Sequence, residues 1–288
     1  MGNATQEISI TFWGVRGSTP CANKENMEFG GNTSCLEIDI PGTEEMLILD
    51  SGTGIRNLGN CIVNRPDKIR GRIFITHPHW DHIQGFPFFK PIYGSKNYFA
   101  IHMPDQGQEG GCKDILDGHL TKTFFPVTLD MIDANLEYVT QPQDRINYKH
   151  YEVEFMLANH PVQTAVYKIH VDDKKIVYCP DNELGAFDGE GSTFQNRLKE
   201  FVQGVDLLIH DGQYNRKSYQ AKEGWGHSAW EYVVKFAKAA EVQRLFITHH
   251  DPDSDDEKLL ALDEYLRVEH NDSFIEVGLA KEGEEILI

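Results

Sequence analysis

The sequence lacks paired cysteines, long apolar runs and an excess of basic residues. Its five cysteines are odd in number and show no CxxC spacing, which favours reduced thiols over a disulfide framework. We expect all five to be buried as small apolar side chains. No stretch of about 18 or more apolar residues occurs, and the N-terminus lacks the basic and apolar regions of a secretory signal. These absences predict a cytoplasmic protein without a membrane span.

Positive charge is also scarce, since 27 Lys and Arg residues stand against 45 Asp and Glu residues and give a net charge of −18. Proteins that bind long nucleic acids usually gather Lys and Arg into a basic patch. Long nucleic acid is therefore not expected as a partner, unless a local basic patch offsets the net charge. A small molecule is the expected substrate.

The domain organisation follows from length and composition. The chain has 288 residues, of which 40% are hydrophobic and 25% charged, and this is enough to bury a sizeable core. No linker rich in Pro, Gly or Ser divides it, and no internal repeat occurs. We therefore predict one domain over residues 1–288, with residues 86–133 as an embellishment at the active-site side.

Short β-branched and aromatic runs recur along the chain and predict strands. Such runs begin at Ile8, Cys35, Met46, Arg72, Asn97, Tyr151, Thr164, Lys175, Asp206 and Arg244. Helical spacing of apolar residues is clearest over residues 227–241 and after Ser254. The pairs Ser228 with Glu231 and Ser254 with Glu257 have the spacing of a capping box. The pattern predicts an α/β fold of two sheets with helices on their outer faces.

The most specific motif is THPHWDH over residues 76–82, directly after a strand-like run. His77 and His79 are two residues apart, so in extended backbone their side chains point the same way. Asp81 and His82 fall where the chain turns and can face another direction. Imidazole nitrogens and carboxylate oxygens are ligands that zinc, manganese and iron ions accept. The spacing therefore favours two adjacent metal ions over one.

The alternative interpretation of this motif is a chance group of histidines on a solvated loop. A two-metal centre needs more ligands, and three later positions supply them, each directly after a strand-like run: His160, Asp181 and His249. His250 competes with His249 for the last position. We prefer His249 because it ends its strand as His77 ends its own.

The order and spacing of these motifs resemble the metallo-β-lactamase superfamily, and especially its ribonuclease Z and cyclic-phosphodiesterase branch. The likeness covers nearly the whole chain. Five motifs carry it: LILDSGTG with Asp50, THPHWDH, NHPVQT with His160, YCPDNE with Asp181 and ITHHDP with His249. The resemblance implies a four-layered αβ/βα sandwich, the metallo-β-lactamase fold, with the metal ions between the two sheets at the ends of loops.

The resemblance also implies how the ligands are shared. One ion is held by His77, His79 and His160, the other by Asp81, His82 and His249, and Asp181 bridges both. Asp50 orders the surrounding loops without being a ligand. Zinc is the default identity of the two divalent ions, with manganese or iron as alternatives.

Two more segments resemble the phosphodiesterase branch: DLLIHDGQY, which contains Asp211, and the His-Ser segment that begins at His227. In that branch the histidine contacts the scissile phosphate and the acidic residue orients it. The resemblance thus implies Asp211 and His227 as catalytic residues, together with the ligand Asp81. Without it, Asp211 would be a turn residue and His227 a polar residue ahead of a helix.

These features predict a metal-dependent hydrolase that attacks a small phosphodiester, such as a cyclic nucleotide, with hydroxide held by two metal ions. No Gly/Pro-rich basic arm of the kind by which ribonuclease Z binds tRNA occurs between the motifs. Trp80 and Trp225 are the aromatic residues that we expect outside the core, where they could line a substrate pocket. Two alternatives stay open: a lactam, lactone or thioester hydrolase on the same centre, and a non-catalytic metal- or nucleotide-binding protein. A homodimer is compatible with the resemblance.

Overall fold

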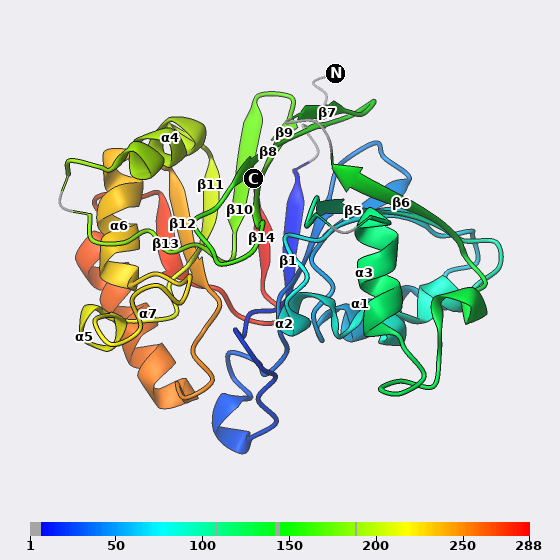
Figure 1. The fold of residues 1–288 in the computed structure, drawn as a ribbon. Coiled ribbons are helices and arrows are strands. Elements are labelled where there is room, and N and C mark those ends of the chain that lie inside the picture. The colour runs from blue at the N-terminus through cyan, green and yellow to red at the C-terminus, as the bar shows by residue number, and fades with distance from the viewer. Residues whose placement is uncertain (1–6, 108, 142–144, 188) are drawn as a thin grey trace.

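Two seven-stranded sheets face one another and carry helices on their outer faces (Figure 1). The computed structural model describes residues 7–107, 109–141, 145–187 and 189–288, so the first six residues of the N-terminal segment lie outside it. Apolar side chains of both sheets, among them Phe12, Tyr167 and Phe246, pack together between the sheets. Two further apolar clusters lie under the outer helices. The predicted four-layered α/β sandwich is confirmed.

The first sheet has the strand order β14-β1-β2-β3-β4-β5-β6. Its strands are β1 (Ser9–Gly14), β2 (Cys35–Asp39), β3 (Glu45–Leu49), β4 (Arg70–Phe74), β5 (Tyr98–Pro104), β6 (Asn135–Gln141) and β14 (Glu285–Leu287). β1 pairs antiparallel with both β2 and β14. β3 to β6 are parallel, so their carboxyl ends share one edge of the sheet.

The second sheet has the order β13-β12-β11-β10-β9-β8-β7. Its strands are β7 (Arg145–Asn147), β8 (Glu152–Leu157), β9 (Ala165–Val171), β10 (Lys174–Cys179), β11 (Leu207–Asp211), β12 (Arg244–Thr248) and β13 (Glu276–Leu279). β10 to β13 are parallel and also end at one edge. The Ala165 N–H donates to the Thr76 carbonyl at 2.9 Å, so the two sheets are joined where the THPHWDH motif begins.

Helices cover the two outer faces, with α4, α6 and α7 on the left of Figure 1 and α1 and α3 on the right. Their bounds are α1 (Ile55–Ile62), α2 (Trp80–Ile83), α3 (Gly111–His119), α4 (Thr193–Val202), α5 (Arg216–Tyr219), α6 (Trp230–Ala239) and α7 (Asp256–His270). Short 3-10 turns span Lys24–Asn26, Phe86–Phe88, Lys90–Tyr93 and Leu129–Met131. α6 and α7 match the two predicted helices.

The cap predicted for α6 is wrong. The residue before the helix is Ala229, and no side chain caps it. The Ser228 hydroxyl instead donates to the Asn182 carbonyl and accepts from the Leu184 N–H. The Glu231 carboxylate, the other half of the predicted box, accepts from a backbone N–H outside the helix. Tertiary contacts have taken both side chains away from the helix end.

The cap predicted for α7 is displaced by one residue. Asp255 precedes the helix, and its carboxylate accepts from the Lys258 N–H at 2.9 Å. Ser254 serves another purpose, because its carbonyl oxygen accepts from Arg16 Nη1 at 2.6 Å. The helix is therefore where the sequence predicts it, with an aspartate in place of the serine at its start.

Residues 86–133 contribute to the first sheet as well as to its cover. β5 lies between β4 and β6 and pairs parallel with both. Phe86 and Phe89 are buried under the sheet with Leu116 of α3, whereas Phe88 is exposed. The segment thus supplies one interior strand and part of the apolar layer outside it.

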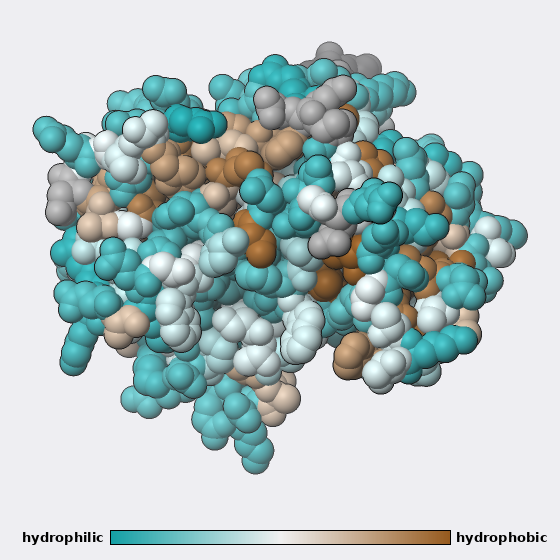
Figure 2. All heavy atoms as spheres, in the orientation of Figure 1, coloured by the Kyte–Doolittle hydropathy of each residue, from teal (hydrophilic) through white to brown (hydrophobic). Residues whose placement is uncertain are grey.

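The described surface is largely hydrophilic on the face drawn in Figure 2, with apolar patches between the polar side chains. Within the described chain, none of the helices has the length and apolar character that crossing a membrane requires. All five cysteines are free, but Cys61 is exposed, so the prediction that all five are buried is wrong there. Cys61 lies in the last turn of α1, next to the helix face that Leu58 and Ile62 bury.

Candidate metal centre

Side chains from four loops meet at the edge where the two sheets are joined. The loops after β4, β8, β10 and β12 supply His77, His79, Asp81 and His82, then His160, then Asp181, and last His249. β4 in one sheet, and β10 and β12 in the other, each end at this edge. Loops that follow such strand ends lie close together and commonly form the ligand site of an α/β fold.

The seven side chains form two groups that share Asp181. The outer cluster is His77, His79, His160 and Asp181, and the inner cluster is Asp81, His82, Asp181 and His249. Within each group, one possible ligand atom per residue lies within 4.8 Å of all the others. His79 is partly exposed, whereas the His160 side chain is 1% exposed and every residue of the inner cluster is buried. All seven predicted ligands are thus brought together, and their binding of metal stays a prediction.

Short distances within each cluster show that the ligand atoms face a common space. In the outer cluster, His160 Nε2 lies 3.2 Å from His79 Nδ1. In the inner cluster, His249 Nε2 lies 3.1 Å from Asp81 Oδ2 and 3.2 Å from Asp181 Oδ1. Nitrogen and oxygen atoms at these separations can bind one ion between them.

Three buried atoms in this space make no hydrogen bond within the described chain: His77 Nε2, His82 Nε2 and Asp181 Oδ1. His82 Nε2 and Asp181 Oδ1 lie 2.9 Å apart, so they contact each other without satisfying hydrogen-bond geometry. A buried polar atom without a partner costs roughly 1–3 kcal/mol. Cations bound in the two clusters would satisfy all three, and imidazole with carboxylate is the donor set that zinc, manganese and iron ions accept. The residues therefore fit two divalent metal ions, one in each cluster.

Contacts behind the ligands hold the rings in place. The buried Asp50 carboxylate lies 2.8 Å from His82 Nδ1 and accepts from the Thr76 N–H at 2.7 Å. His160 Nδ1 lies 3.0 Å from the Gly226 carbonyl oxygen. Because Nδ1 of each ring is engaged from behind, Nε2 is directed toward the clusters. Asp50 thus contacts a candidate ligand from outside the centre.

His249 and His250 have different surroundings. His249 belongs to the inner cluster, whereas His250 Nε2 lies 2.8 Å from the Ala280 carbonyl oxygen. Burial lowers the pKa of His250 to about 3, so its imidazole is neutral and donates to that carbonyl. Of the two histidines that competed for the last ligand position, only His249 faces the centre.

Strained backbone surrounds the inner cluster. Three of the five described non-glycine residues with positive φ lie there: Ser18 at 62°, Asp50 at 62° and His249 at 61°. Such conformations are unfavourable for residues with side chains and concentrate at functional sites. The Ser18 N–H donates to Asp81 Oδ2 at 2.7 Å. Gly17 has no room for a side chain, because an added Cβ would lie 2.2 Å from His249 Nδ1.

The pKa shifts of His77 and Asp181 favour the ionisation states that metal binding requires, neutral imidazole and ionised carboxylate. His82 differs, because burial would lower its pKa but Asp181, Asp50 and Asp81 outweigh burial and raise the pKa well above its ordinary value. Burial lowers the pKa of His77 well below its ordinary value, so this ring is neutral. Burial opposes the ionisation of Asp181, but His249 and His82 outweigh it and hold the pKa of this carboxyl well below its ordinary value.

The predicted catalytic pair lies beside both clusters. His227 Nδ1 is 3.0 Å from Asp211 Oδ2, and the His227 ring stacks on that of His249 with 4.7 Å between centroids. Burial would lower the pKa of His227, but Asp211, Asp181 and Asp81 outweigh it and raise the pKa to about 9. Since Asp211 engages Nδ1, the other ring nitrogen is left for a ligand.

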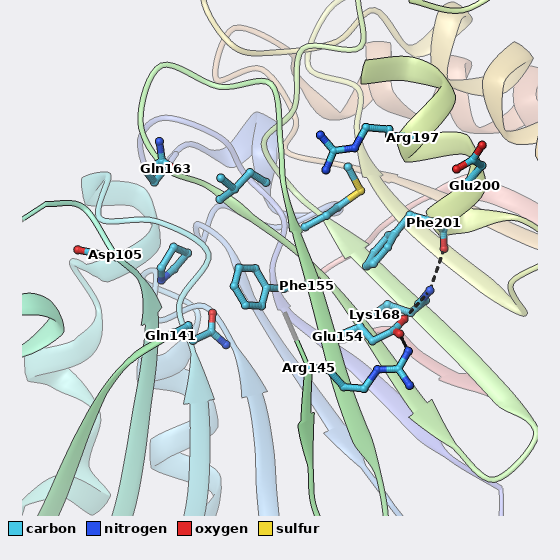
Figure 3. A pocket seen from close by; sticks show the side chains of 13 residues that line it. Asp105, Gln141, Arg145, Glu154, Phe155, Gln163, Lys168, Arg197, Glu200 and Phe201 are labelled. Atoms are coloured by element: carbon cyan, nitrogen blue, oxygen red, sulfur yellow. Dashed lines mark hydrogen bonds and ion pairs between the residues drawn. The ribbon is translucent and has the colours of Figure 1, made fainter. Parts of the chain in front are cut away.

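A pocket of about 810 Å³ lies apart from these residues, between the ends of β5 and β6 and the strands β8 and β9 (Figure 3). Its lining contains none of the seven candidate ligands and neither member of the catalytic pair. Two of its cations, Arg145 and Lys168, are already paired with Glu154. We assign it no part in the chemistry of the metal centre.

One buried carboxylate near the centre is absent from the sequence-based prediction. Glu183 accepts hydrogen bonds from the Tyr219 hydroxyl, the Gly224 N–H and the Gly226 N–H, each at 2.8 Å. It thereby holds the loop whose Gly226 carbonyl contacts His160. Two features of the sequence could have indicated this contact. Glu183 lies two positions after Asp181, and glycines stand on both sides of Trp225.

Comparison with known proteins agrees with this geometry. A family model described as "Beta-lactamase superfamily domain" matches residues 47–250. The chain is 24% identical to a ribonuclease Z of Methanothermobacter thermautotrophicus and 22% identical to one of Haloarcula marismortui, and both matches cover 84% of this chain and 86% of the relative.

Solved structures resemble the whole chain. The metallo-β-lactamase fold protein YhfI from Bacillus subtilis aligns with a TM-score of 0.69 at 20% identity, over 98% of this chain and 100% of that one. A diphosphatase from the PhnP family aligns with a TM-score of 0.67 at 15% identity, over 97% of each chain. At these identities the structural matches show the fold alone. The family model, in contrast, spans most of the sequence, and the chain therefore belongs to the β-lactamase superfamily.

Proposed function

We propose that this protein is a metal-dependent phosphodiesterase that hydrolyses a small phosphodiester such as a cyclic nucleotide. The observation that carries the proposal is the His227–Asp211 pair directly beside the two clusters. A metal centre alone would suit several hydrolytic reactions. An oriented imidazole beside it suits a phosphodiester, whose charged oxygens accept an N–H and whose alkoxide leaving group needs a proton.

When bound, two divalent ions supply a water of lowered pKa and positive charge that offsets the charge of the phosphate. Asp211 holds Nδ1 of His227, which leaves Nε2 to donate to a phosphate oxygen and then to the departing alkoxide oxygen. Asp211 itself accepts from the Gln213 N–H at 2.9 Å and from the Ser228 N–H at 3.3 Å. The pair is therefore fixed before the substrate arrives.

Charge supports a small substrate over a long one. The whole chain has a net charge of −18, and residues 86–133 contain four lysines, no arginine and six acidic residues. Neutralising many phosphates requires many Lys and Arg residues on one surface. Long RNA remains the competing substrate class because the similar proteins are named ribonuclease Z.

The substrate class is tested with zinc-loaded protein on a panel: a cyclic nucleotide, a dinucleotide, a long RNA, nitrocefin and a lactone. We expect hydrolysis of the two small phosphodiesters and no turnover of nitrocefin or the lactone. A preference for the long RNA would contradict the small substrate. Turnover of nitrocefin or the lactone, without turnover of any phosphodiester, would contradict the reaction class.

The role of His227 is tested by varying the leaving group. In the H227A variant, turnover should fall much more for a dinucleotide than for bis(p-nitrophenyl) phosphate. The leaving group of the dinucleotide is an alkoxide, which needs a proton, whereas that of bis(p-nitrophenyl) phosphate is the stable nitrophenolate. A positioned general acid contributes roughly 100- to 10,000-fold, and most of this should be lost only with the poor leaving group. Equal losses on both substrates would exclude proton donation by His227. The D211N variant should show the same pattern with smaller losses.

A further inference from the structure

Two tryptophans lie directly beside residues of the outer cluster or of its support. Trp80 directly follows His79, and Trp225 directly precedes Gly226. The Gly226 carbonyl oxygen lies 3.0 Å from His160 Nδ1, and His160 Nε2 lies 3.2 Å from His79 Nδ1. This chain of contacts places the backbones of the two tryptophans next to the His79–His160 pair. The His160 side chain is 1% exposed, so His79 is the partly exposed ligand of this pair.

Both tryptophan side chains are strongly exposed, Trp80 at 76% and Trp225 at 61%. Tryptophan is highly buried on average, because its large apolar surface is unfavourable in water. Neither indole contacts another aromatic ring in the part of the chain that the structure describes; the ring contacts of tryptophan there involve Trp230. Two large apolar side chains are thus exposed next to the outer cluster.

The backbone of Trp225 is fixed even though its side chain is exposed. Gly224 and Gly226 on either side of it have φ values of 86° and 90°, which a residue with a side chain rarely adopts. The N–H groups of both glycines donate to the buried Glu183 carboxylate. An added Cβ on Gly226 would lie 2.3 Å from His160 Nδ1, so the turn packs directly on a candidate ligand.

The backbone of Trp80 is fixed by its place in the ligand motif. It is the first residue of α2, and its carbonyl accepts from the Gln84 N–H at 2.7 Å. The residues before and after it, His79 and Asp81, belong to the outer and inner clusters. Neither tryptophan can move far without moving a candidate ligand.

We propose that Trp80 and Trp225 form a stacking site for the base of a nucleoside phosphodiester. The inference rests on the proposed function and names the part of the substrate that the metal centre does not bind. A base has a flat π-face that stacks on an aromatic side chain without regard to base identity. Two exposed indoles on fixed backbone beside the clusters would bind one base while the phosphodiester lies at the clusters.

The test compares two esters that share a leaving group and differ in the base: thymidine 5′-(p-nitrophenyl phosphate) and methyl p-nitrophenyl phosphate. In W80A and W225A, KM for the thymidine ester should rise roughly 5- to 100-fold, as expected for the loss of one base-stacking contact. Its kcat, and both constants for the methyl ester, should change less than about threefold. W80F and W225F keep an aromatic ring, so their KM for the thymidine ester should be close to that of the wild type.

A matched control removes an exposed apolar side chain far from the clusters. Ile275 is 67% exposed, and its N–H donates to the Gln243 carbonyl just before β12, at the end of that strand opposite to His249. I275A should leave KM for both esters unchanged. A direct measurement accompanies the kinetics: thymidine 5′-monophosphate should quench the tryptophan fluorescence of the wild type, and less so that of W80A and W225A.

The outcomes separate this inference from the proposed function. If zinc-loaded wild type hydrolyses neither ester, the phosphodiesterase proposal fails. If it hydrolyses both, and the tryptophan variants change the two esters equally or not at all, the stacking site alone is refuted. A rise in KM confined to the thymidine ester supports both proposals.

Discussion

The outer and inner clusters share Asp181 yet differ in charge and in burial. The inner cluster has two carboxylates, Asp81 and Asp181, and is buried throughout, whereas the outer cluster has one carboxylate and one partly exposed ligand, His79. Electrostatic attraction is stronger where water is excluded and where more opposite charge is present. We therefore expect the inner cluster to retain its ion and the outer cluster to exchange its ion more readily with solvent.

The supports behind the two clusters differ as well. The inner cluster is supported by a carboxylate that contacts a ligand directly, since Asp50 lies 2.8 Å from His82 Nδ1. The outer cluster is supported indirectly, because Glu183 accepts from the Gly226 N–H and the Gly226 carbonyl in turn contacts His160. One carboxylate for each cluster makes the comparison testable with matched substitutions.

Removing the shared ligand should have the largest effect. D181N replaces a charged ligand of both clusters, so we expect fewer than one ion per chain after dialysis and a fall in turnover of at least roughly 100-fold. Metal analysis and kinetics measure these values. D206N is the control, since Asp206 is a buried carboxylate that accepts from the Lys175 N–H at the opposite end of the second sheet. Two tightly bound ions in D181N would contradict a shared ligand.

Removing the inner support should have the next largest effect. D50N is expected to weaken the inner ion by roughly 10- to 100-fold, because it removes the charge behind His82, and to leave the outer ion almost unchanged. Competition with a chelator, followed by metal analysis, gives both affinities. Y178F is the matched control, because the Tyr178 hydroxyl donates to Asp50 at 3.0 Å without touching His82. If D50N lost the outer ion first, our assignment of Asp50 as the support of the inner cluster would be wrong.

Removing the support of the outer cluster, Glu183, should have a smaller effect, and only on the affinity of the outer ion. A glutamine at Glu183 can accept on one side only, so E183Q loses either the contact with the Gly226 N–H or the contact with the Gly224 N–H. We expect up to about tenfold weaker binding of the outer ion, with inner affinity unchanged. Y219F, which removes one donor and leaves both glycine contacts, should have little effect. A fall in thermal stability without any change in metal affinity would show that Glu183 only stabilises the fold.

The smallest effect on metal content should come from His250. H250A removes the buried contact with the Ala280 carbonyl, so we expect the free energy of unfolding to fall by roughly 1–3 kcal/mol. The number of bound ions should stay the same, because His250 faces away from the centre. Denaturant unfolding and metal analysis measure the two quantities. Loss of an ion in H250A would make His250, and not its neighbour, the last ligand.

Interior strands were predictable from sequence, and edge strands were not. Every predicted run overlaps an observed strand, because a strand buried on both faces requires a run of apolar residues. β6, β7, β13 and β14 were not predicted. β7 and β14 have three residues each, and β6 alternates exposed and half-buried positions at the edge of its sheet. Short or edge strands bury too little apolar surface to give a clear pattern.

The candidate ligands were predictable because they follow strand ends in recognisable motifs, but of their supports only Asp50 was predicted. Ser18 and Glu183 reach the centre through backbone N–H contacts with residues far away in sequence. The pairing of Ser228 with Glu231 shows the converse, since correct local spacing was overridden by tertiary partners. Sequence spacing identifies residues that are placed by the strand they follow. Contacts between residues far apart in the sequence depend on how the chain packs in three dimensions.

The pairing of β1 with β14 also constrains when the centre forms during translation. Residues 9–11 pair with residues 285–287, so the first sheet gains its outermost strand only after residues 285–287 have left the ribosome. His249 likewise follows Asp81 by 168 residues. Domains generally fold as units, and the N-terminal part of a chain emerges first during synthesis. A nascent chain can therefore present the THPHWDH motif early, while the inner cluster closes only late in synthesis.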